Sequence, residues 1–125
     1  LKDGNHFRTI GIRIEKNTQD TANSTVTKLR AGLVLLRVES GEHAGKYVHA
    51  AHANAPSAED LKEAVILYGD HNMLSEAAVV EDQQGAGVYH GIVDEAQILW
   101  GTEDGATIEA VKDVMKLVHF YSEVG

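Results

Sequence analysis

Apolar and polar residues alternate strictly near the start of the chain. Ile10, Ile12 and Ile14 share one face of residues 8 to 15, and the positions between them hold glycine or charged residues. This period of two is typical of a half-buried strand. Residues 17 to 25 contain no large apolar side chain, which predicts a flexible linker. We therefore expect residues 1–25 to form an extended N-terminal arm and linker, and residues 26–125 to form the domain.

Short apolar runs separated by turn residues dominate the middle of the chain. Residues 33–36 are apolar on both faces, which is typical of a buried strand, and Gly32 indicates a bend. A glycine-bearing turn at 40–45 leads to a returning strand at 46–50, so the two strands predict a hairpin. The remaining segments predict strands at 64–68, 77–80 and 88–93, turns at 69–72 and 81–87, and a short, ambiguous helix that Ser57 could cap.

The C-terminal part follows a helical period instead. Apolar residues recur there at spacings of three and four, and Asp104 or Thr107 can cap the first turn. We expect a helix of roughly 12 to 14 residues that packs on the sheet, because isolated helices of this length are marginal in water. The apolar stripe consists of Ile108, Val111, Met115 and Val118, widened by Val114, Leu117 and Tyr121. The chain as a whole predicts an α+β fold, a small β-rich domain with a C-terminal helix.

Composition limits the function more than the fold. The 125 residues are 43% apolar, enough for one buried core, and no apolar run approaches the roughly 18 residues of a membrane-spanning helix. The chain has no cysteine, which excludes disulfides and thiolate chemistry. Its net charge of −8 comes without a Lys/Arg cluster, so direct nucleic-acid binding is disfavoured. We expect neither a membrane nor a nucleic acid as partner.

Residues that could carry chemistry lack a specific arrangement. His49 and His52 have an i, i+3 spacing that suits a metal on a helix, but on a strand their rings point to opposite faces, so we favour surface histidines. The glycine-rich stretch 85–91 matches neither phosphate-binding pattern and predicts a loop. Adjacent carboxylates indicate solvated charge, and no serine lies in a nucleophile elbow. We expect no catalytic residues, metal or cofactor.

Large aromatic side chains are the remaining candidates for a binding role. They serve equally well in a core or at an interface, and core is the default interpretation. Trp100 follows Ile98 and Leu99 and precedes a glycine. We therefore select Trp100, together with Tyr89, as the candidates for a subunit interface.

The order of several short pieces resembles the head decoration (capsid-stabilising) proteins of tailed phages, the lambda-type family. Each piece is short and individually unspecific, so the order carries the resemblance, which covers roughly residues 26 to 120. The C-terminal helix completes the order. The pieces before it are Leu29-Arg30-Ala31-Gly32-Leu33-Val34-Leu35, Gly45-Lys46-Tyr47-Val48, Ala64-Val65-Ile66-Leu67 and His90-Gly91-Ile92-Val93-Asp94-Glu95-Ala96.

The resemblance implies a compact domain with a small, tulip-shaped, barrel-like sheet. It also implies a homotrimer at three-fold and quasi-three-fold sites on the outside of the expanded head. There the protein, made in the host cytoplasm, would clamp neighbouring major capsid protein subunits against the pressure of packaged DNA. In such proteins the N-terminal segment is a mobile arm that can pair with a capsid strand. The seven histidines and the helix-like residues 57–63 depart from the family pattern.

An arm formed by Ile10, Ile12 and Ile14 would suit β-augmentation, in which a free strand joins an exposed sheet edge. Ordering each residue costs about 1–2 kcal/mol, against about 0.5–1.5 kcal/mol per hydrogen bond and about 1.5–3 kcal/mol per buried isoleucine. The net free energy of docking one arm is therefore near zero, and three arms on a trimer would bind strongly. Two alternatives stay open: residues 8 to 15 pair within their own domain, or the protein is a small-ligand binding or enzymatic β-rich domain that uses the Gly85–Gly91 loop and His90.

Overall fold

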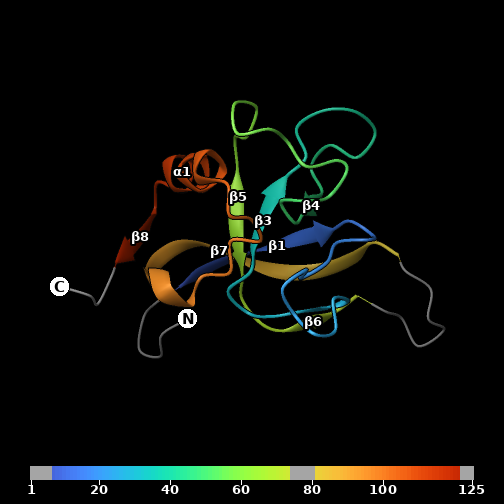
Figure 1. Ribbon diagram of the computed structural model, residues 1–125, viewed down its shortest axis with the longest axis horizontal. Helices are drawn as coiled ribbons and strands as arrows, with labels where there is room; N and C mark the ends of the chain where they lie inside the picture. Colours follow the sequence, from blue (N-terminus) through green and yellow to red (C-terminus); the bar gives the residue numbers. More distant parts are fainter. Residues whose placement is uncertain (1–6, 74–80, 122–125) are drawn as a thin grey trace.

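A barrel of five strands forms the centre of the computed structural model, which describes residues 7–73 and 81–121 (Figure 1). The strand order is β1-β4-β3-β5-β7, and β7 pairs back onto β1 to close the barrel. The parallel pair β1–β4 is the exception among otherwise antiparallel barrel neighbours. The strands are β1 (Arg8–Ile14), β3 (Val34–Arg37), β4 (Tyr47–Val48), β5 (Ala64–Leu67) and β7 (Gln83–Asp94). The prediction of a small β-rich α+β fold with a barrel-like sheet is confirmed.

Strand β7 is long because it has different partners along its length. Its first part pairs with β1 on one side, where Ile14 is matched with Gln83, and with β5 on the other, where Ile66 is matched with Val88. Its last four residues pair in parallel with β8 (Val118–Tyr121). Figure 1 shows β7 running across the whole molecule, with β8 beside its far end.

The predicted loop at Gly85–Gly91 is wrong, because these residues lie inside β7. A Cβ atom at Gly85 would stand 2.8 Å from Ile14 Cδ1, and one at Gly87 would stand 2.5 Å from Val65 Cγ2. Glycine therefore lets β7 pass close over side chains that fill the barrel. The turn predicted at 81–87 is wrong for the same reason, since Gln83 begins the strand.

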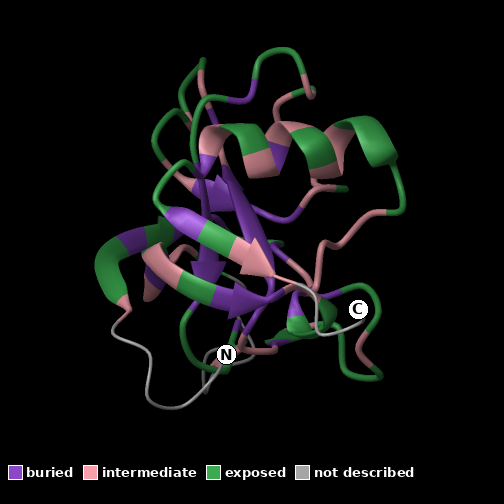
Figure 2. Ribbon diagram, turned by 90° about the vertical axis from the view of Figure 1, so that its left-hand side faces the viewer, coloured by how far each residue is buried: buried purple, intermediate pink, exposed green. Residues whose placement is uncertain are grey.

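Two hydrophobic clusters lie on opposite sides of the barrel wall. One fills the barrel and the other lies between its outer face and α1 (Gly105–Val114), so β3 and β5 are buried on both faces (Figure 2). The inner cluster contains Ile12, Ile14, Leu29, Leu33, Leu35, Tyr47, Val65, Leu67 and Met73. The outer cluster includes Val34, Leu36, Ile66, Val88, Val93, Val111, Met115 and Val118.

The expected free N-terminal arm is corrected by the position of β1. Residues Arg8–Ile14 pair with β7 along their full length, and the side chains of Ile12 and Ile14 are 5% and 0% exposed. The alternative of pairing within the domain is therefore confirmed. The edge of β7 is supplied by the same chain, so β1 reaches it at high effective concentration. Residues 1–6 lie outside the described residues.

The segment 17–25 is not the expected flexible linker. Asp20 is 2% exposed, and its carboxylate accepts hydrogen bonds from Arg30 Nε at 2.7 Å and Nη2 at 3.1 Å. Thr18 is also buried, and Asp20 N donates to Val26 O. Charge-assisted and turn hydrogen bonds order this segment, although it contains no large apolar anchor.

The predicted hairpin and buried strands are confirmed. Leu36 of β3 is matched with Val48 of β4, and β5 falls within the expected segment 64–68. The segment after Ser57, whose helix content the sequence left ambiguous, is a turn, in which Ser57 Oγ accepts from Asp60 N at 3.2 Å. Within the predicted turn 69–72, β6 (His71–Asn72) pairs with β2 (Lys28–Leu29) to form a small second sheet below the barrel. The run 77–80 lies outside the described residues.

The C-terminal helix is present but shorter than predicted. Asp104 caps it by accepting from Ala106 N and from Thr107 Oγ1, and the helix ends at Val114. The apolar pattern continues through Val118, but this residue lies in β8 because the end of β7 offers a free edge. A short 3-10 turn, η1 (Glu95–Gln97), connects β7 to the segment before α1. Within the described ranges, no helix has the length and apolar character needed to cross a membrane.

Candidate functional site

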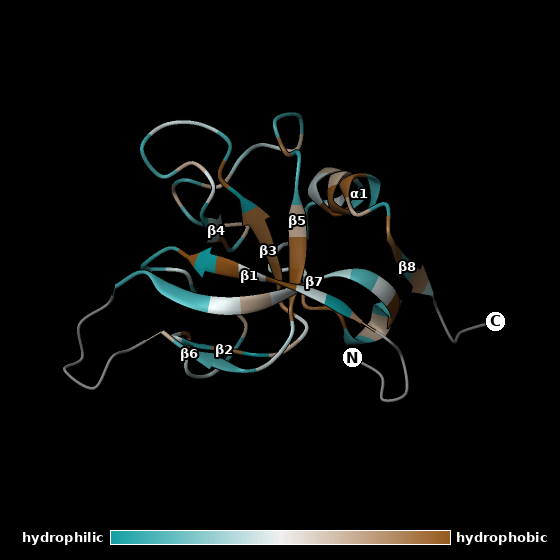
Figure 3. Ribbon diagram, turned by 180° about the vertical axis from the view of Figure 1, so that it is seen from behind, coloured by the Kyte–Doolittle hydropathy of each residue, from teal (hydrophilic) through white to brown (hydrophobic). Residues whose placement is uncertain are grey.

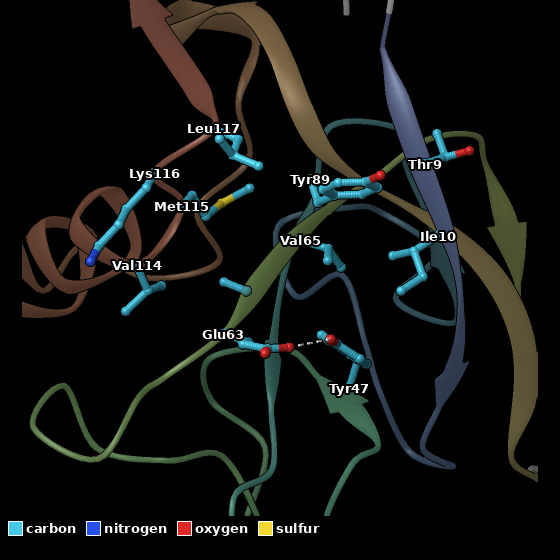
Figure 4. Close-up of a pocket in the computed structure, with 11 residues that line it drawn as sticks. Thr9, Ile10, Tyr47, Glu63, Val65, Tyr89, Val114, Met115, Lys116 and Leu117 are labelled. Atoms are coloured by element: carbon cyan, nitrogen blue, oxygen red, sulfur yellow. Dashed lines mark hydrogen bonds between the residues drawn. The ribbon is translucent and has the colours of Figure 1, made fainter.

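A groove opens at one mouth of the barrel, between β1, β7 and the end of α1. Its volume is about 460 Å³. In Figure 4 the side chains of Ile10, Val65 and Tyr89 lie on one side of it and those following α1 on the other. The lining residues are Thr9, Ile10, Tyr47, Glu63, Ala64, Val65, Tyr89, Val114, Met115, Lys116 and Leu117. We call this feature the mouth groove.

The strand pairing explains why the barrel opens here. Within the described part of the chain, β1 is matched with β4 only at Ile14 and Tyr47. Ile10 lies on the same face of β1 as Ile12 and Ile14, so its side chain points toward the barrel interior. However, Ile10 lies beyond the closing pair of Ile14 and Tyr47. The mouth groove therefore lies where the wall between β1 and β4 is incomplete.

The rim of the mouth groove exposes three large apolar side chains. Leu117 is 58% exposed, Ile10 is 50% exposed and Tyr89 is 37% exposed. Scattered single apolar residues are normal on a surface, whereas neighbouring ones around a concavity are typical of interaction sites. In the hydropathy view, the long loops beside β4 and β5 are mostly hydrophilic (Figure 3). The rim thus gives an acidic protein a local apolar surface.

One end of the mouth groove carries a polar network, in which Tyr47 is buried and Glu63 is exposed. Tyr47 donates its hydroxyl to Glu63 Oε2 at 3.4 Å, and Arg37 Nη1 lies 2.9 Å from the same oxygen. Burial raises the pKa of the Tyr47 phenol, and the nearby Glu63 carboxylate raises it further. The phenol therefore stays neutral at physiological pH and acts as a hydrogen-bond donor at this end of the groove.

The predicted site residues separate into different environments. The structure brings Ile10 and Tyr89 together at the mouth groove, whereas Ile12 and Ile14 belong to the inner core. Trp100 does not line the groove. It packs on Phe120 with ring centroids 5.5 Å apart, and Lys112 Nζ lies 5.7 Å from its ring centroid. An interface role for Trp100 and Tyr89 stays a prediction.

The interpretation of His49 and His52 as surface histidines on opposite faces of a strand is wrong, because His49 is 5% exposed, both residues follow β4, and their rings contact each other. His49 and His52 stack edge to face at 5.5 Å, and each accepts a backbone N–H on Nδ1, from Gln19 and Asn54 respectively. Throughout residues 7–73 and 81–121, no three His, Asp or Glu side chains are grouped so as to hold a metal ion. His90 lies on β7, so the glycine-rich loop of the ligand-binding alternative does not exist as a loop.

Sequence reasoning missed Leu117 as a surface residue. Its position in a helical apolar stripe indicated a core role, but the helix ends before it and its side chain is exposed.

Comparison of the chain with models of known families, with curated proteins and with solved structures gives no match in any of the three.

Proposed function

We propose that this protein is a capsid decoration protein. In this proposal it binds as a homotrimer to the major capsid protein at three-fold sites on the outside of an expanded phage head, and stabilises the head against internal DNA pressure. The order of the sequence pieces and the small barrel with one helix support it. The observation that carries it is the exposed apolar rim formed by Ile10, Tyr89 and Leu117 on a protein of net charge −8.

The position of β1 changes the proposed mode of attachment. Because β1 is a barrel strand, it is not free to join a capsid sheet, and the mouth groove takes over the docking role. An apolar segment of the major capsid protein would cover the three rim side chains. Each is about half exposed, so full burial contributes roughly 1 kcal/mol per side chain. Three grooves on one trimer convert these small contributions into firm attachment.

Co-sedimentation with phage heads tests this function. The wild-type protein is expected to sediment with expanded heads and to remain in the supernatant with unexpanded ones. Leu117→Ser removes the most exposed rim side chain and is expected to weaken head binding at least tenfold. Ile92→Ser is the matched control, because Ile92 is 47% exposed and does not line the groove. Equal binding by both variants would exclude the mouth groove as the docking surface.

The oligomeric state is tested separately by light scattering of the isolated protein. A mass of three chains is expected for the wild type and for both variants, so that any loss of binding reports docking and not assembly. A monomer at all concentrations, together with undiminished head binding, would contradict the trimeric part of the proposal.

One observation favours a second candidate, a site for a small apolar ligand. The mouth groove combines apolar walls with a phenol and a carboxylate at one end, and a few polar groups among apolar walls are common in ligand pockets. Titration with a medium-chain alkylamine, followed by amide NMR, tests it. Shifts confined to the groove residues would support this candidate, and their absence at millimolar ligand would reject it.

A further inference from the structure

One edge of β1 lacks a neighbouring strand along most of its length. On the side of β7 every residue of β1 is matched, whereas on the other side, within the described residues, β1 meets β4 only at Ile14 and Tyr47. The chain before β4 turns toward the end of β3, where Gly45 N donates to Val38 O at 2.8 Å. β4 therefore covers the end of this edge and leaves its beginning uncovered. We call residues 9–11 the open edge.

The backbone groups of the open edge point away from β7. Gly11 is matched with Ala86, but Ala86 O accepts from Tyr68 N at 2.9 Å on the far side of β7, so this matched pair exchanges no hydrogen bonds. Glu15 N donates across the other edge, to β4, at 3.0 Å. Because alternate residues of a strand direct their N–H and C=O groups to the same side, those of Thr9 and Gly11 point to the side of β4 as well. Among the described residues, no backbone group on that side bonds to either of them.

There is room for another chain beside the open edge. Thr9 and Gly11 are exposed, and a Cβ atom added at Gly11 would meet nothing within 4 Å. The mouth groove begins at the same place, since Thr9 and Ile10 line it (Figure 4). A row of uncovered N–H and C=O groups is a template for a further strand, and an adjoining pocket can take the side chains of that strand.

The unbalanced charge next to the open edge is positive. Arg8 and Lys116 are exposed and form no ion pair within the described part of the chain. They lie near the same end of the groove, because Arg8 is matched with His90 and the residue after Lys116 accepts from Gly91 N at 3.1 Å. The lining carboxylate Glu63 is already engaged by an arginine of β3 at 2.9 Å. An acidic side chain is therefore the complement of this end.

We infer that the open edge receives an extended segment of another protein as an added strand, with apolar side chains directed into the mouth groove and an acidic residue beside Arg8 and Lys116. The backbone of the segment pairs with Thr9 and Gly11, and its inward side chains cover Ile10. β1 itself stays in the barrel, held by β7. The inference rests on the docking role proposed for the mouth groove and adds the conformation and the charge of the docked segment.

A synthetic peptide tests the strand addition. The probe is acetyl-Glu-Thr-Val-Thr-Val-Thr-Glu-amide, in which a glutamate at each end allows either strand direction. With saturating probe, the Gly11 N–H of the full chain is expected to exchange with solvent about tenfold more slowly, while the Ile12 N–H, which faces β7, keeps its rate. Binding without protection of Gly11 would overturn the inference, and so would the absence of binding at millimolar probe.

Two N-methylated versions of the probe control for backbone pairing. One carries the methyl groups on its valine nitrogens and the other on its threonine nitrogens. Since alternate N–H groups of a strand point to opposite sides, only one of these two sets faces β1. We expect one version to bind about tenfold more weakly than the probe and the other to bind as well as the probe. Undiminished binding by both versions would show that side chains alone hold the peptide, which contradicts strand addition.

Lys116→Glu tests the charge of the docked segment. This variant is expected to bind the probe about fivefold more weakly, and to regain binding when lysine replaces both glutamates of the probe. Lys28→Glu, on β2, is the matched control because Lys28 does not line the mouth groove. Equal weakening by the two variants would mean a general repulsion from an acidic protein and would overturn the charge assignment.

The same measurements separate this inference from its neighbours. Protection of Gly11 that rises with the concentration of the protein alone would show that a second copy occupies the open edge, which contradicts a foreign segment. Loss of co-sedimentation with heads, together with retained peptide binding, would reject the capsid function and keep the strand addition. Head binding without any peptide binding would do the reverse.

Discussion

Ile14 of β1 is matched with Tyr47 of β4 in parallel register, and this pair closes the barrel on the side of β1 that faces away from β7. Ile14 is fully buried, whereas Ile10, four residues earlier on the same strand, is half exposed in the mouth groove. The end of β1 is therefore part of the core, and its beginning is part of the surface.

Ile14→Ala is expected to lower the free energy of unfolding by about 2–5 kcal/mol, because it leaves a cavity inside the barrel. Ile10→Ala is expected to cost less than about 1 kcal/mol, since its side chain is already half solvated. Urea unfolding of the two variants measures the difference. Equal, small effects would mean that β1 is dispensable for folding, as a free arm would be.

Gly87→Ala is expected to destabilise the protein by about 1–3 kcal/mol through overpacking, because the new Cβ would meet Val65 Cγ2 at 2.5 Å. The double variant Gly87→Ala/Val65→Ala should recover part of this loss. Gly11→Ala is the matched control in a strand, since a Cβ atom added at Gly11 would meet nothing within 4 Å. Thermal unfolding distinguishes the three, and an unaffected Gly87→Ala would show that β7 can shift away from β5.

The stability of the protein is expected to decrease as pH falls from about 6.5 to about 4, because the unfolded chain binds a proton at His49 that the native state excludes. The displacement of the His49 pKa to about 4 corresponds to at most about 3 kcal/mol. His49→Asn keeps a side-chain acceptor for Gln19 N without titrating and should flatten this slope. Urea unfolding at pH 7 and at pH 4.5 measures it. Identical slopes in both proteins would contradict the assignment.

Asp82 is expected to stabilise the end of the barrel where β1 meets β4 at neutral pH. Its carboxylate lies 2.8 Å from Lys46 Nζ and accepts from Lys16 N at 2.8 Å, and the hydrogen bond from Lys46 is the main cause that lowers its pKa to about 2. Because the native pKa is below the unfolded value, this stabilisation is present above about pH 4 and is lost as pH falls toward 2. Asp82→Asn should cost about 1–2 kcal/mol at pH 7 and almost nothing at pH 2. A penalty that is equal at both pH values would contradict this charge effect.

Local patterns predicted the strands whose environment is uniform. The continuous apolar runs at 33–36 and 64–67 are buried on both faces, which is what such a run indicates. The alternation around Ile12 and Ile14 predicted a strand correctly but could not identify its partner, because β7 lies about 75 residues away.

The missed features depend on tertiary partners. Gly85 and Gly87 indicated a loop because their requirement for close packing arises from Ile14 and Val65, which no local window contains. The helical period continued through Val118, but pairing with β7 ended the helix earlier. The mouth groove combines residues from positions 9 to 117, and no local pattern distinguishes the exposed Ile10 from its buried neighbours on the same face.

The pairing of β1 with β7 also constrains synthesis of the chain. Arg8 is matched with His90, so the first strand leaves the ribosome long before its main partner has been made. Until then, its apolar face is a target for chaperones and for other nascent chains. Closure of the barrel is consequently a late event, dominated by contacts between distant parts of the sequence, and we expect it to take milliseconds to seconds, as is usual for folds of this topology.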